Sequence, residues 1–371
     1  MASSTTGKTP GTRPLTRLTT GPLRILVSLI VPVLAFVVLR WAFVFMRDAR
    51  ADKLAIGVVG LLIGVGGVWV LYLVTDNLVS ILPERVRETV RPFVFVGPAL
   101  VILSAYLVYP ALRTVYLSFF DARSQAFVGL DNYAFALTSP DMLLAFRNNV
   151  LWLITVTGFV VSLGLIVAVM VDRIGRWESV AKSIIFLPMA ISAVGAAVIW
   201  KFVYSFQPIQ RPQIGLLNAI YTALGGEPQG WLILKPWNNF FLITIMIWIL
   251  TGFAMVVLSA AIKGVPSELL EAARIDGASE VRIFFSVIVP YIRGALITIT
   301  TTVLIMVLKV FDIVFVMTNG QFETEVIANR MYREMFTFGN YGRASALAVI
   351  LLLAVIPIMI YNVRNIEAAR R

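Results

Sequence analysis

The chain has 371 residues, of which 59% are hydrophobic and only 14% are charged, and its mean hydropathy is +0.88. Soluble domains are about 45–50% apolar and about 25% charged, so the composition indicates an all-α, polytopic membrane protein. The chain contains no Cys and no His, which excludes disulfides, thiolate or imidazole metal sites and Ser-His-Asp catalysis. We therefore expect no enzymatic chemistry in this chain.

The net charge of +11 does not indicate a nucleic-acid-binding surface. The basic residues flank apolar runs and do not gather with exposed aromatic residues on a polar domain. At the ends of apolar runs, Lys and Arg set the orientation of a membrane protein and meet anionic lipid headgroups. The charge therefore indicates a lipid membrane, and no nucleic acid, as the partner.

The first 24 residues are rich in Ser, Thr, Gly and Pro and carry four basic side chains. This composition predicts a disordered, basic cytoplasmic tail. About 20 apolar residues cross the ~30 Å hydrocarbon core as a helix, and eight runs of this kind follow the tail. We expect the eight spans at residues 25–46, 54–82, 93–119, 148–171, 183–206, 239–262, 294–318 and 344–363.

The basic residues between the spans predict the orientation of the chain. With the N-terminus inside, the cytoplasmic segments carry seventeen Lys and Arg, whereas the external segments carry ten over a similar length. This bias places both termini in the cytoplasm, including the C-terminal tail 366–371, and it places the segment 263–294 on the same side. The segment 47–53 is an exception, because its three basic residues would lie outside.

The segment 263–294 is the longest charged, amphipathic interval between two apolar runs. Pro266-Ser267-Glu268 predicts a helix start. Asp276-Gly277 predicts the end of that helix, since Gly tolerates the left-handed conformation of a tight helix exit. A second helical run then leads to the next span. We therefore expect two short helices joined by a sharp Gly turn.

Six residues of this segment form the pattern Glu-Ala-Ala-x-x-Asp-Gly-Ala, namely Glu271, Ala272, Ala273, Asp276, Gly277 and Ala278. The pattern, placed before the last two spans, resembles the EAA loop of binding-protein-dependent ABC importer permeases. In that family the loop is a coupling helix that docks in a cleft of the cytoplasmic ATPase. The resemblance implies that these six residues couple the chain to an ATPase subunit; an ordinary charged loop is the alternative interpretation.

Three further motifs resemble the same family. Residues 127–133, Phe-Val-Gly-Leu-Asp-Asn-Tyr, are similar to a segment of its sugar-type permeases, although an interfacial turn explains them equally well. Phe186-Leu187-Pro188 is similar to the family's Leu-Pro turn, where Pro188 can bend the helix. Residues 336–345 are similar to the start of its last span. Together the resemblance covers roughly residues 93–365.

The resemblance implies the type I ABC importer permease fold, with a six-helix core at residues 93–365 and two additional spans within residues 25–92. The larger permease of maltose-type importers also has two extra N-terminal spans. Only 28 residues, 120–147, stand here where that subunit has a large external domain. The proportions are closer to those of permeases for alpha-glucosides or related di- and oligosaccharides.

The implied assembly contains a second permease, two ATPase subunits and an extracytoplasmic sugar-binding protein in the bacterial cytoplasmic membrane. ATP and Mg²⁺ would be bound by the ATPase subunits, so this chain is expected to hold no cofactor and no metal. ATP closes the ATPase dimer, and the coupling helices carry that movement to the spans.

Sugars are held by hydrogen bonds to polar side chains and by stacking on aromatic faces. Lys309 and Asp312 stand three residues apart on one predicted helical face, and charges within a membrane face protein or a water-filled path. An internal ion pair that fixes helix packing is the alternative. In the family, the residues that line the substrate path fall on the same three helices as Ser192, Trp248 and Lys309. Asparagines of the family are replaced here by Val307 and Val310. The candidates for the substrate path are Ser192, Trp248, Thr251, Lys309, Phe311 and Asp312.

Other functions stay open at this point. An importer of the same type for polyamines, phosphate or another polar solute would carry the same coupling loop. An ion-coupled secondary transporter would use Lys309 and Asp312, but the loop around Glu271 would then be unexplained. A membrane enzyme would need a nucleophile, an acid–base pair or a metal cluster. The chain has no His or Cys and few carboxylates within the spans to supply these groups.

Overall fold

The computed structural model of the protein describes residues 22–47, 52–79 and 83–370. Most of the predicted N-terminal tail, residues 48–51 and 80–82 and the final residue therefore lie outside the described residues. All regular elements within the described ranges are helices, and their one β-type contact is an isolated antiparallel bridge between Phe120 and Phe127. The all-α fold class is confirmed. The chain divides into two compact units, residues 1–110 and 111–371.

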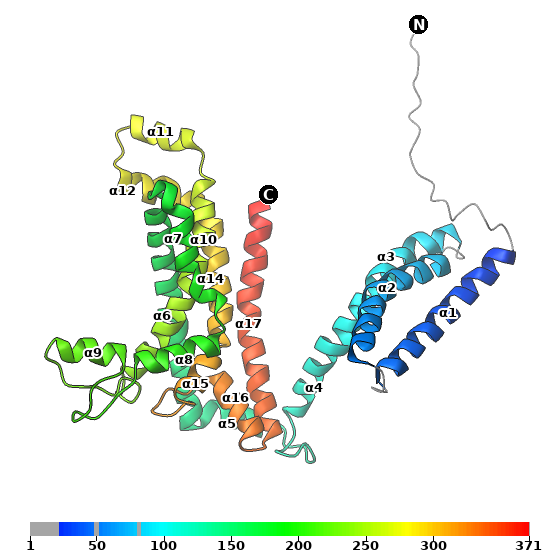
Figure 1. Ribbon diagram of the computed structural model, residues 1–371, viewed down its shortest axis with the longest axis horizontal. Coiled ribbons are helices and arrows are strands. Elements are labelled where there is room, and N and C mark those ends of the chain that lie inside the picture. The colour runs from blue at the N-terminus through cyan, green and yellow to red at the C-terminus, as the bar shows by residue number, and fades with distance from the viewer. Residues whose placement is uncertain (1–21, 48–51, 80–82, 371) are drawn as a thin grey trace, which may run out of the picture. The chain divides into compact units, whose positions relative to one another are not determined.

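The first unit is built from long apolar helices. α1 (Pro22–Arg47) and α2 (Lys53–Val79) lie side by side, and α2 also contacts α3 (Glu84–Leu103), as Figure 1 shows. Tyr72 of α2 stacks on Phe95 of α3 with ring centroids 5.5 Å apart. A π-helical turn, Ser104–Val108, continues α3 into α4 (Tyr109–Leu117). The third span begins nine residues before its predicted start, because the charged stretch after Pro83 is already helical.

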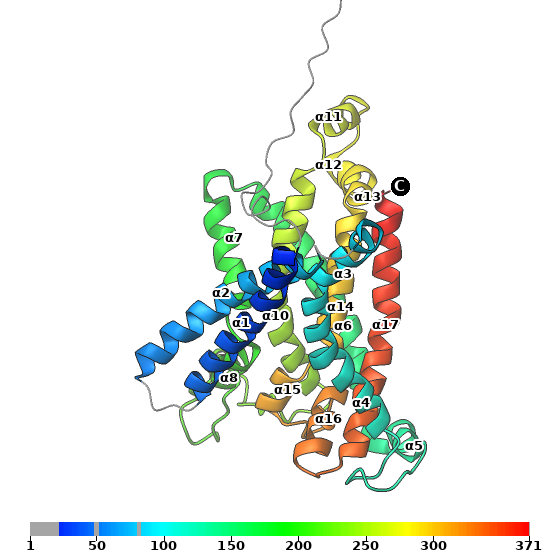
Figure 2. The same ribbon diagram turned by 90° about the vertical axis from the view of Figure 1, so that its right-hand side faces the viewer.

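The second unit is a bundle with short helices at both ends. Its long helices are α6 (Pro140–Asp172), α10 (Asn238–Lys263), α14 (Arg293–Leu308) and α17 (Tyr341–Arg370). The shorter helices are α5 (Asp131–Thr138), α7 (Glu178–Phe186), α8 (Ala193–Val203), α9 (Leu216–Ala223), α11 (Ser267–Ile275), α12 (Glu280–Ile283), α13 (Val289–Tyr291), α15 (Asp312–Met317) and α16 (Ile327–Phe336). Figures 1 and 2 show α11 and α12 at one end of the bundle and α5, α15 and α16 at the other.

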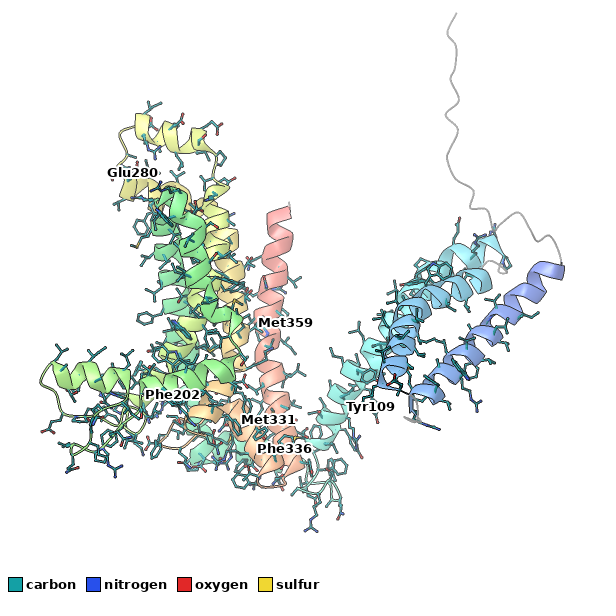
Figure 3. All side chains as sticks on the ribbon, viewed as in Figure 1. Tyr109, Phe202, Glu280, Met331, Phe336 and Met359 are labelled. Atoms are coloured by element: carbon teal, nitrogen blue, oxygen red, sulfur yellow. The ribbon has the colours of Figure 1, made fainter. Side chains whose placement is uncertain are left out.

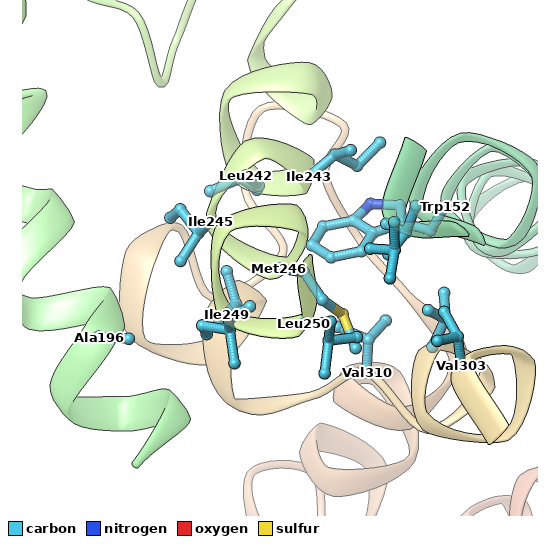
Figure 4. Close-up of a cluster of buried hydrophobic side chains, with 14 of the residues drawn as sticks. Trp152, Ala196, Leu242, Ile243, Ile245, Met246, Ile249, Leu250, Val303 and Val310 are labelled. Carbon is cyan, nitrogen blue, oxygen red and sulfur yellow. The ribbon is translucent and has the colours of Figure 1, made fainter. Parts of the chain in front are cut away.

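The core of the second unit lies where α6 and α10 meet. Trp152 of α6 is fully buried and faces Leu242 and Met246 of α10, as Figure 4 shows. Val303 of α14 and Val310 close the same cluster. These apolar contacts hold the long helices at fixed positions, from which the end segments project.

Within the part of the chain that the structure describes, six helices are long and apolar enough to cross a membrane, or up to eight if each of two bent helix pairs counts as one span. The higher number agrees with the eight predicted spans. One bent pair joins residues 175–190 to α8 at 98°, and the other joins residues 280–291 to α14 at 70°. In the first pair, a 3-10 turn at Leu187–Ala190 ends the helix at the predicted Leu-Pro turn. α8 then runs across the direction of α7 (Figure 1).

The span predicted at 294–318 is not one helix. α14 ends at Leu308, and the backbone leaves the helical region at Lys309 (φ −99°, ψ 19°) and Phe311 (φ −139°, ψ −60°) before α15 begins. Because of this break, the prediction that Lys309 and Asp312 share one helical face is wrong. Neither Pro nor Gly marks the break in the sequence, so hydropathy alone gives no sign of it.

The segment 127–133 consists of a short turn and the start of α5, and it is bonded to the residues that precede it. Asn132 donates from its amide to the carbonyl oxygens of Ser118 (2.9 Å) and Phe120 (2.7 Å). The backbone N–H of Tyr341 donates to the carbonyl oxygen of Ala122 (3.0 Å), which ties the turn to the start of α17. The motif therefore has a packing role within the chain.

Candidate functional site

The predicted coupling segment forms two short helices, as expected from its sequence. Pro266 precedes α11 with an extended backbone (φ −57°, ψ 134°), and α11 ends at Ile275. Ser279 caps α12 by accepting the N–H of Arg282 at 3.4 Å. Figure 3 places Glu280 of α12 at one end of the bundle and Met331 of α16 at the other.

Gly277 closes the turn between these helices. Its φ of +79° is in the left-handed region. The N–H of Gly277 donates to the carbonyl oxygen of Arg274 (3.0 Å), and that of Ala278 to the carbonyl oxygen of Ala273 (3.0 Å). These two bonds are the Schellman pattern, which satisfies the last carbonyls of a helix. The direction of α11 is therefore fixed by local bonds.

The remaining residues of the motif are open to a partner. Glu271, Ala272 and Asp276 are exposed, while Ala273 and Ala278 are half-buried. Within the described residues the Glu271 carboxylate has no hydrogen-bond or ion-pair partner, whereas Arg274 pairs with Glu280 across the turn at 2.8 Å. Ile275, 86% exposed, is an apolar side chain at the end of α11. Within the described residues, α11 thus presents two carboxylates without partners, Glu268 and Glu271, small residues and two exposed apolar side chains, Leu269 and Ile275.

An ionic cluster ties the start of this segment to neighbouring helices. Lys182 of α7 lies 2.8 Å from Asp172 at the end of α6 and 2.6 Å from Glu178. Ser259 of α10 donates to Asp172 at 2.6 Å. Lys263, the last residue of α10, pairs with Glu178. The chain therefore enters the coupling segment from a helix end that is fixed to α6 and α7.

The substrate-path candidates on α8 and α10 are used within the protein. Ser192 is the N-cap of α8 and accepts the N–H of Gly195 at 3.1 Å. Thr251 donates to the carbonyl oxygen of Ile247, one turn earlier, at 2.7 Å. Trp248 is half-buried and packs edge-on against Trp200 of α8, with ring centroids 5.8 Å apart. These contacts are structural and leave a role toward substrate as a prediction.

The candidates near the α14–α15 break are only partly brought together. Lys309 and Phe311 line one largely apolar cavity of about 530 Å³ with residues of α16 and α17. Phe311 packs against Tyr332 of α16 with tilted rings whose centroids are 5.1 Å apart. Asp312 is exposed, and among the described residues neither it nor Lys309 has an ion-pair partner. The alternative of an internal Lys309–Asp312 ion pair is therefore wrong.

Sequence reasoning missed a polar network at the end of the bundle opposite α11. Asn148 and Asn149 of α6 and Asn238 and Asn239 of α10 are all buried. Asn148, Asn238 and Asn239 hold the loop 318–326 through its backbone, and Asn149 accepts the N–H of Ile327, which follows the loop. The signal was present in the sequence as two Asn-Asn pairs at the starts of apolar runs, where unpartnered amides are costly.

Comparisons with known proteins agree with this architecture. Residues 160–367 match the family described as "Binding-protein-dependent transport system inner membrane component". The osmoprotective compounds uptake permease protein GgtC of Synechocystis sp. is 61% identical over 277 residues, which is 75% of this chain and 99% of that protein. The alpha-glucoside transport system permease protein AglF of Rhizobium meliloti is 52% identical over 282 residues, covering 76% and 84% of the two chains.

A solved structure shares the fold. A chain in the crystal structure of a bacterial alginate ABC transporter, in complex with an alginate pentasaccharide-bound periplasmic protein, superimposes with a TM-score of 0.65. It is 20% identical in sequence, and the match covers 75% of this chain and 96% of that chain. The chain described here therefore belongs to the family of binding-protein-dependent transport system inner membrane components, the permease subunits of ABC importers, and is a transporter subunit rather than an enzyme.

Proposed function

We propose that this permease forms, with a second permease, the path by which an alpha-glucoside or a related di- or oligosaccharide enters the cell. Of the two relatives described above, one is named as an uptake permease for osmoprotective compounds and the other as a permease of alpha-glucoside transport. Membership of this family excludes the interpretation as an ion-coupled secondary transporter, which depended on Lys309 and Asp312. An extracytoplasmic sugar-binding protein delivers the substrate, and two ATPase subunits bind the ATP and Mg²⁺ that drive transport.

The observation that carries the mechanism is the shape of α11. It projects from one end of the bundle (Figure 1), and its direction is fixed by two backbone hydrogen bonds at Gly277. A rigid helix transmits displacement, because no soft hinge within it absorbs the movement. The ATPase seats α11 in a cleft, pairs a basic group with the free Glu271 carboxylate, and receives Ile275 as an apolar anchor. The α11 end is then cytoplasmic, and both termini lie inside.

ATPase activity of the purified transporter in nanodiscs tests this function. Binding protein loaded with sucrose or trehalose is expected to stimulate ATP hydrolysis in the wild type, and Glu271→Ala is expected to weaken the stimulation. Glu268→Ala is the matched control, because Glu268 is exposed on the same helix but one turn before the motif. Failure of an ATPase subunit to co-purify with the chain would contradict the proposal.

A second candidate substrate is an osmoprotective compound other than an alpha-glucoside, which the 61% identity to the osmoprotective compounds uptake permease GgtC supports. The same assay distinguishes the two, with glycine betaine, phosphate and putrescine as additional solutes. Stimulation by an alpha-linked disaccharide alone supports the sugar. Stimulation by glycine betaine alone assigns the permease to non-sugar solutes. Stimulation by phosphate or putrescine alone identifies an importer of phosphate or polyamines, the alternative that the sequence left open.

A further inference from the structure

A small cavity lies at the end of the bundle opposite α11. Its volume is about 240 Å³, and its walls come from α6, α10, the residues that precede α10, and the loop 318–326. Arg147, Asn148, Lys235, Phe240 and Glu323 are among the residues that line it. None of the predicted substrate-path residues lines this cavity.

The walls of the cavity are held in place by backbone-directed hydrogen bonds. Asn148 donates to the carbonyl oxygens of Glu323 (2.8 Å) and Glu325 (2.9 Å). Asn238 donates to the carbonyl oxygen of Phe322 at 2.6 Å, and Asn239 donates to that of Glu323 at 3.3 Å. The cavity is therefore preformed, and a ligand would not need to order the loop.

Two polar groups at the cavity are available to a ligand. Glu323, whose side chain is half exposed, accepts from Lys235 through one carboxylate oxygen, and within the described residues its other oxygen has no hydrogen-bond partner. The exposed Arg147 guanidinium has no hydrogen-bond or ion-pair partner among the described residues. At the rim, Lys235 pairs with Glu323 at 2.6 Å through one carboxylate oxygen.

These groups select for a ligand that both donates and accepts hydrogen bonds. The second carboxylate oxygen of Glu323 takes a donor, and Arg147 takes an acceptor. A phosphate would be repelled by the Glu323 carboxylate, and a polyamine would be repelled by Arg147 and Lys235. Hydroxyl groups satisfy both, and Phe240, 38% exposed, offers an aromatic face to the C–H surface of a ring.

We propose that this cavity is a vestibule site that holds one polyhydroxylated ring of the transported sugar as it leaves the binding protein. The inference rests on the proposed sugar function and adds a site to it. Pockets for drug-sized ligands are about 300–1,000 Å³, so a cavity of about 240 Å³ holds one ring of a disaccharide. By holding that ring, the site keeps released sugar at the mouth of the path until the spans open.

The test compares sugar uptake with ATP hydrolysis in the complete transporter. It uses proteoliposomes, trehalose and the trehalose-loaded binding protein. Arg147→Gln removes the free cation, and Leu151→Trp fills the cavity from its α6 wall, with Leu151→Phe as the smaller filling if the Trp variant does not fold. Arg211→Gln is the control, because Arg211 is an exposed arginine of the segment before α10 that does not line the cavity.

We expect the cavity variants to hydrolyse ATP within about twofold of the wild-type rate. Trehalose transported per ATP is expected to fall at least about tenfold in Arg147→Gln, as expected for loss of a charged hydrogen bond, and to fall as well in the filled variant. The Arg211→Gln control is expected to keep both the wild-type rate of ATP hydrolysis and the wild-type amount of trehalose transported per ATP.

Three results would overturn the site. If trehalose transported per ATP is unchanged in Arg147→Gln and in the filled variant, the cavity holds water only. If Arg147→Gln abolishes stimulation by the binding protein but keeps the ratio of uptake to hydrolysis, the surface is a docking contact for that protein. If the wild type shows no stimulation by any sugar, the proposed function fails first, and the vestibule site fails with it.

Discussion

Gly277 shows how a single residue sets the geometry of the coupling segment. Its φ of +79° is a conformation that side chains with a Cβ rarely adopt, and an added Cβ would meet no atom within 4 Å. The cost of replacing it therefore arises from the backbone alone. For an ordinary residue the left-handed conformation costs about 1–2 kcal/mol, and β-branched residues are disfavoured further.

Substitutions at Gly277 are therefore expected to have graded effects. Gly277→Asn should keep most of the sugar-stimulated ATPase activity, because Asn tolerates the left-handed region. Gly277→Val should lower stimulation and uptake about tenfold or more while the protein still inserts in the membrane. Gly294→Ala serves as the control, since an added Cβ there also meets nothing within 4 Å. Equal activity of the Val and Asn variants would contradict the role of this turn.

Ser192 is a second residue whose role can be tested directly. As the N-cap of α8 it accepts the N–H of Gly195, so Ser192→Ala should lower the free energy of unfolding by about 1 kcal/mol. Ser192→Asn keeps a cap and should keep both the thermal midpoint and the KM for uptake. A raised KM in the Asn variant with an unchanged thermal midpoint would instead assign the hydroxyl to substrate binding.

At the scale of elements, the start of α17 is held against the turn at residues 120–122, which is bonded to Asn132 of α5. A Cβ on Gly342 would lie 2.0 Å from the carbonyl oxygen of Phe120 and 2.8 Å from Nδ2 of Asn132. Asn132 donates to that same carbonyl oxygen. The glycine therefore permits a contact between helix and turn that no other residue permits.

Gly342→Ala is expected to destabilise the protein, because overpacking typically costs about 1–3 kcal/mol and here the obstacle is backbone. The thermal midpoint of the purified protein in detergent, followed by tryptophan fluorescence, measures this effect. Gly158→Ala, within α6 and with nothing within 4 Å of the added Cβ, should leave the midpoint unchanged or slightly raised. A Gly342→Ala variant as stable as the control would show that the turn moves away at little cost.

At the scale of the whole molecule, the second unit has two unlike ends. One end carries α11 and the ionic cluster around Lys182, and the other carries α16 and the asparagine-held loop. If α11 meets an ATPase, the two ends face opposite sides of the membrane.

The two ends can be distinguished by chemical labelling, since the native chain has no Cys. A membrane-impermeant maleimide added to intact cells should label Arg211→Cys and should not label Ile275→Cys until the cells are opened. Both positions are exposed, so a difference in labelling reports the side of the membrane. Labelling of Ile275→Cys in intact cells would reverse the orientation deduced from the basic residues.

The sequence predicted much of this molecule, for reasons that are local. The coupling segment was predictable because Pro266 and Gly277 start and end α11 through their own backbone preferences. The break at Lys309 was not predictable, because it lies in an apolar run and depends on contacts with other helices. The Asn148 cavity was not predictable either, since its walls come from segments more than 80 residues apart.

The local closure of α11 has a consequence for how such subunits diversify. Because the bonds at Gly277 lie within residues 273–278, the turn at the end of α11 is closed by its own backbone. If α11 docks on an ATPase as proposed, exposed side chains such as Glu271 and Ile275 can change to fit a different ATPase without altering the solute path. Under that proposal, permeases for different solutes would share one ATPase through the same short helix.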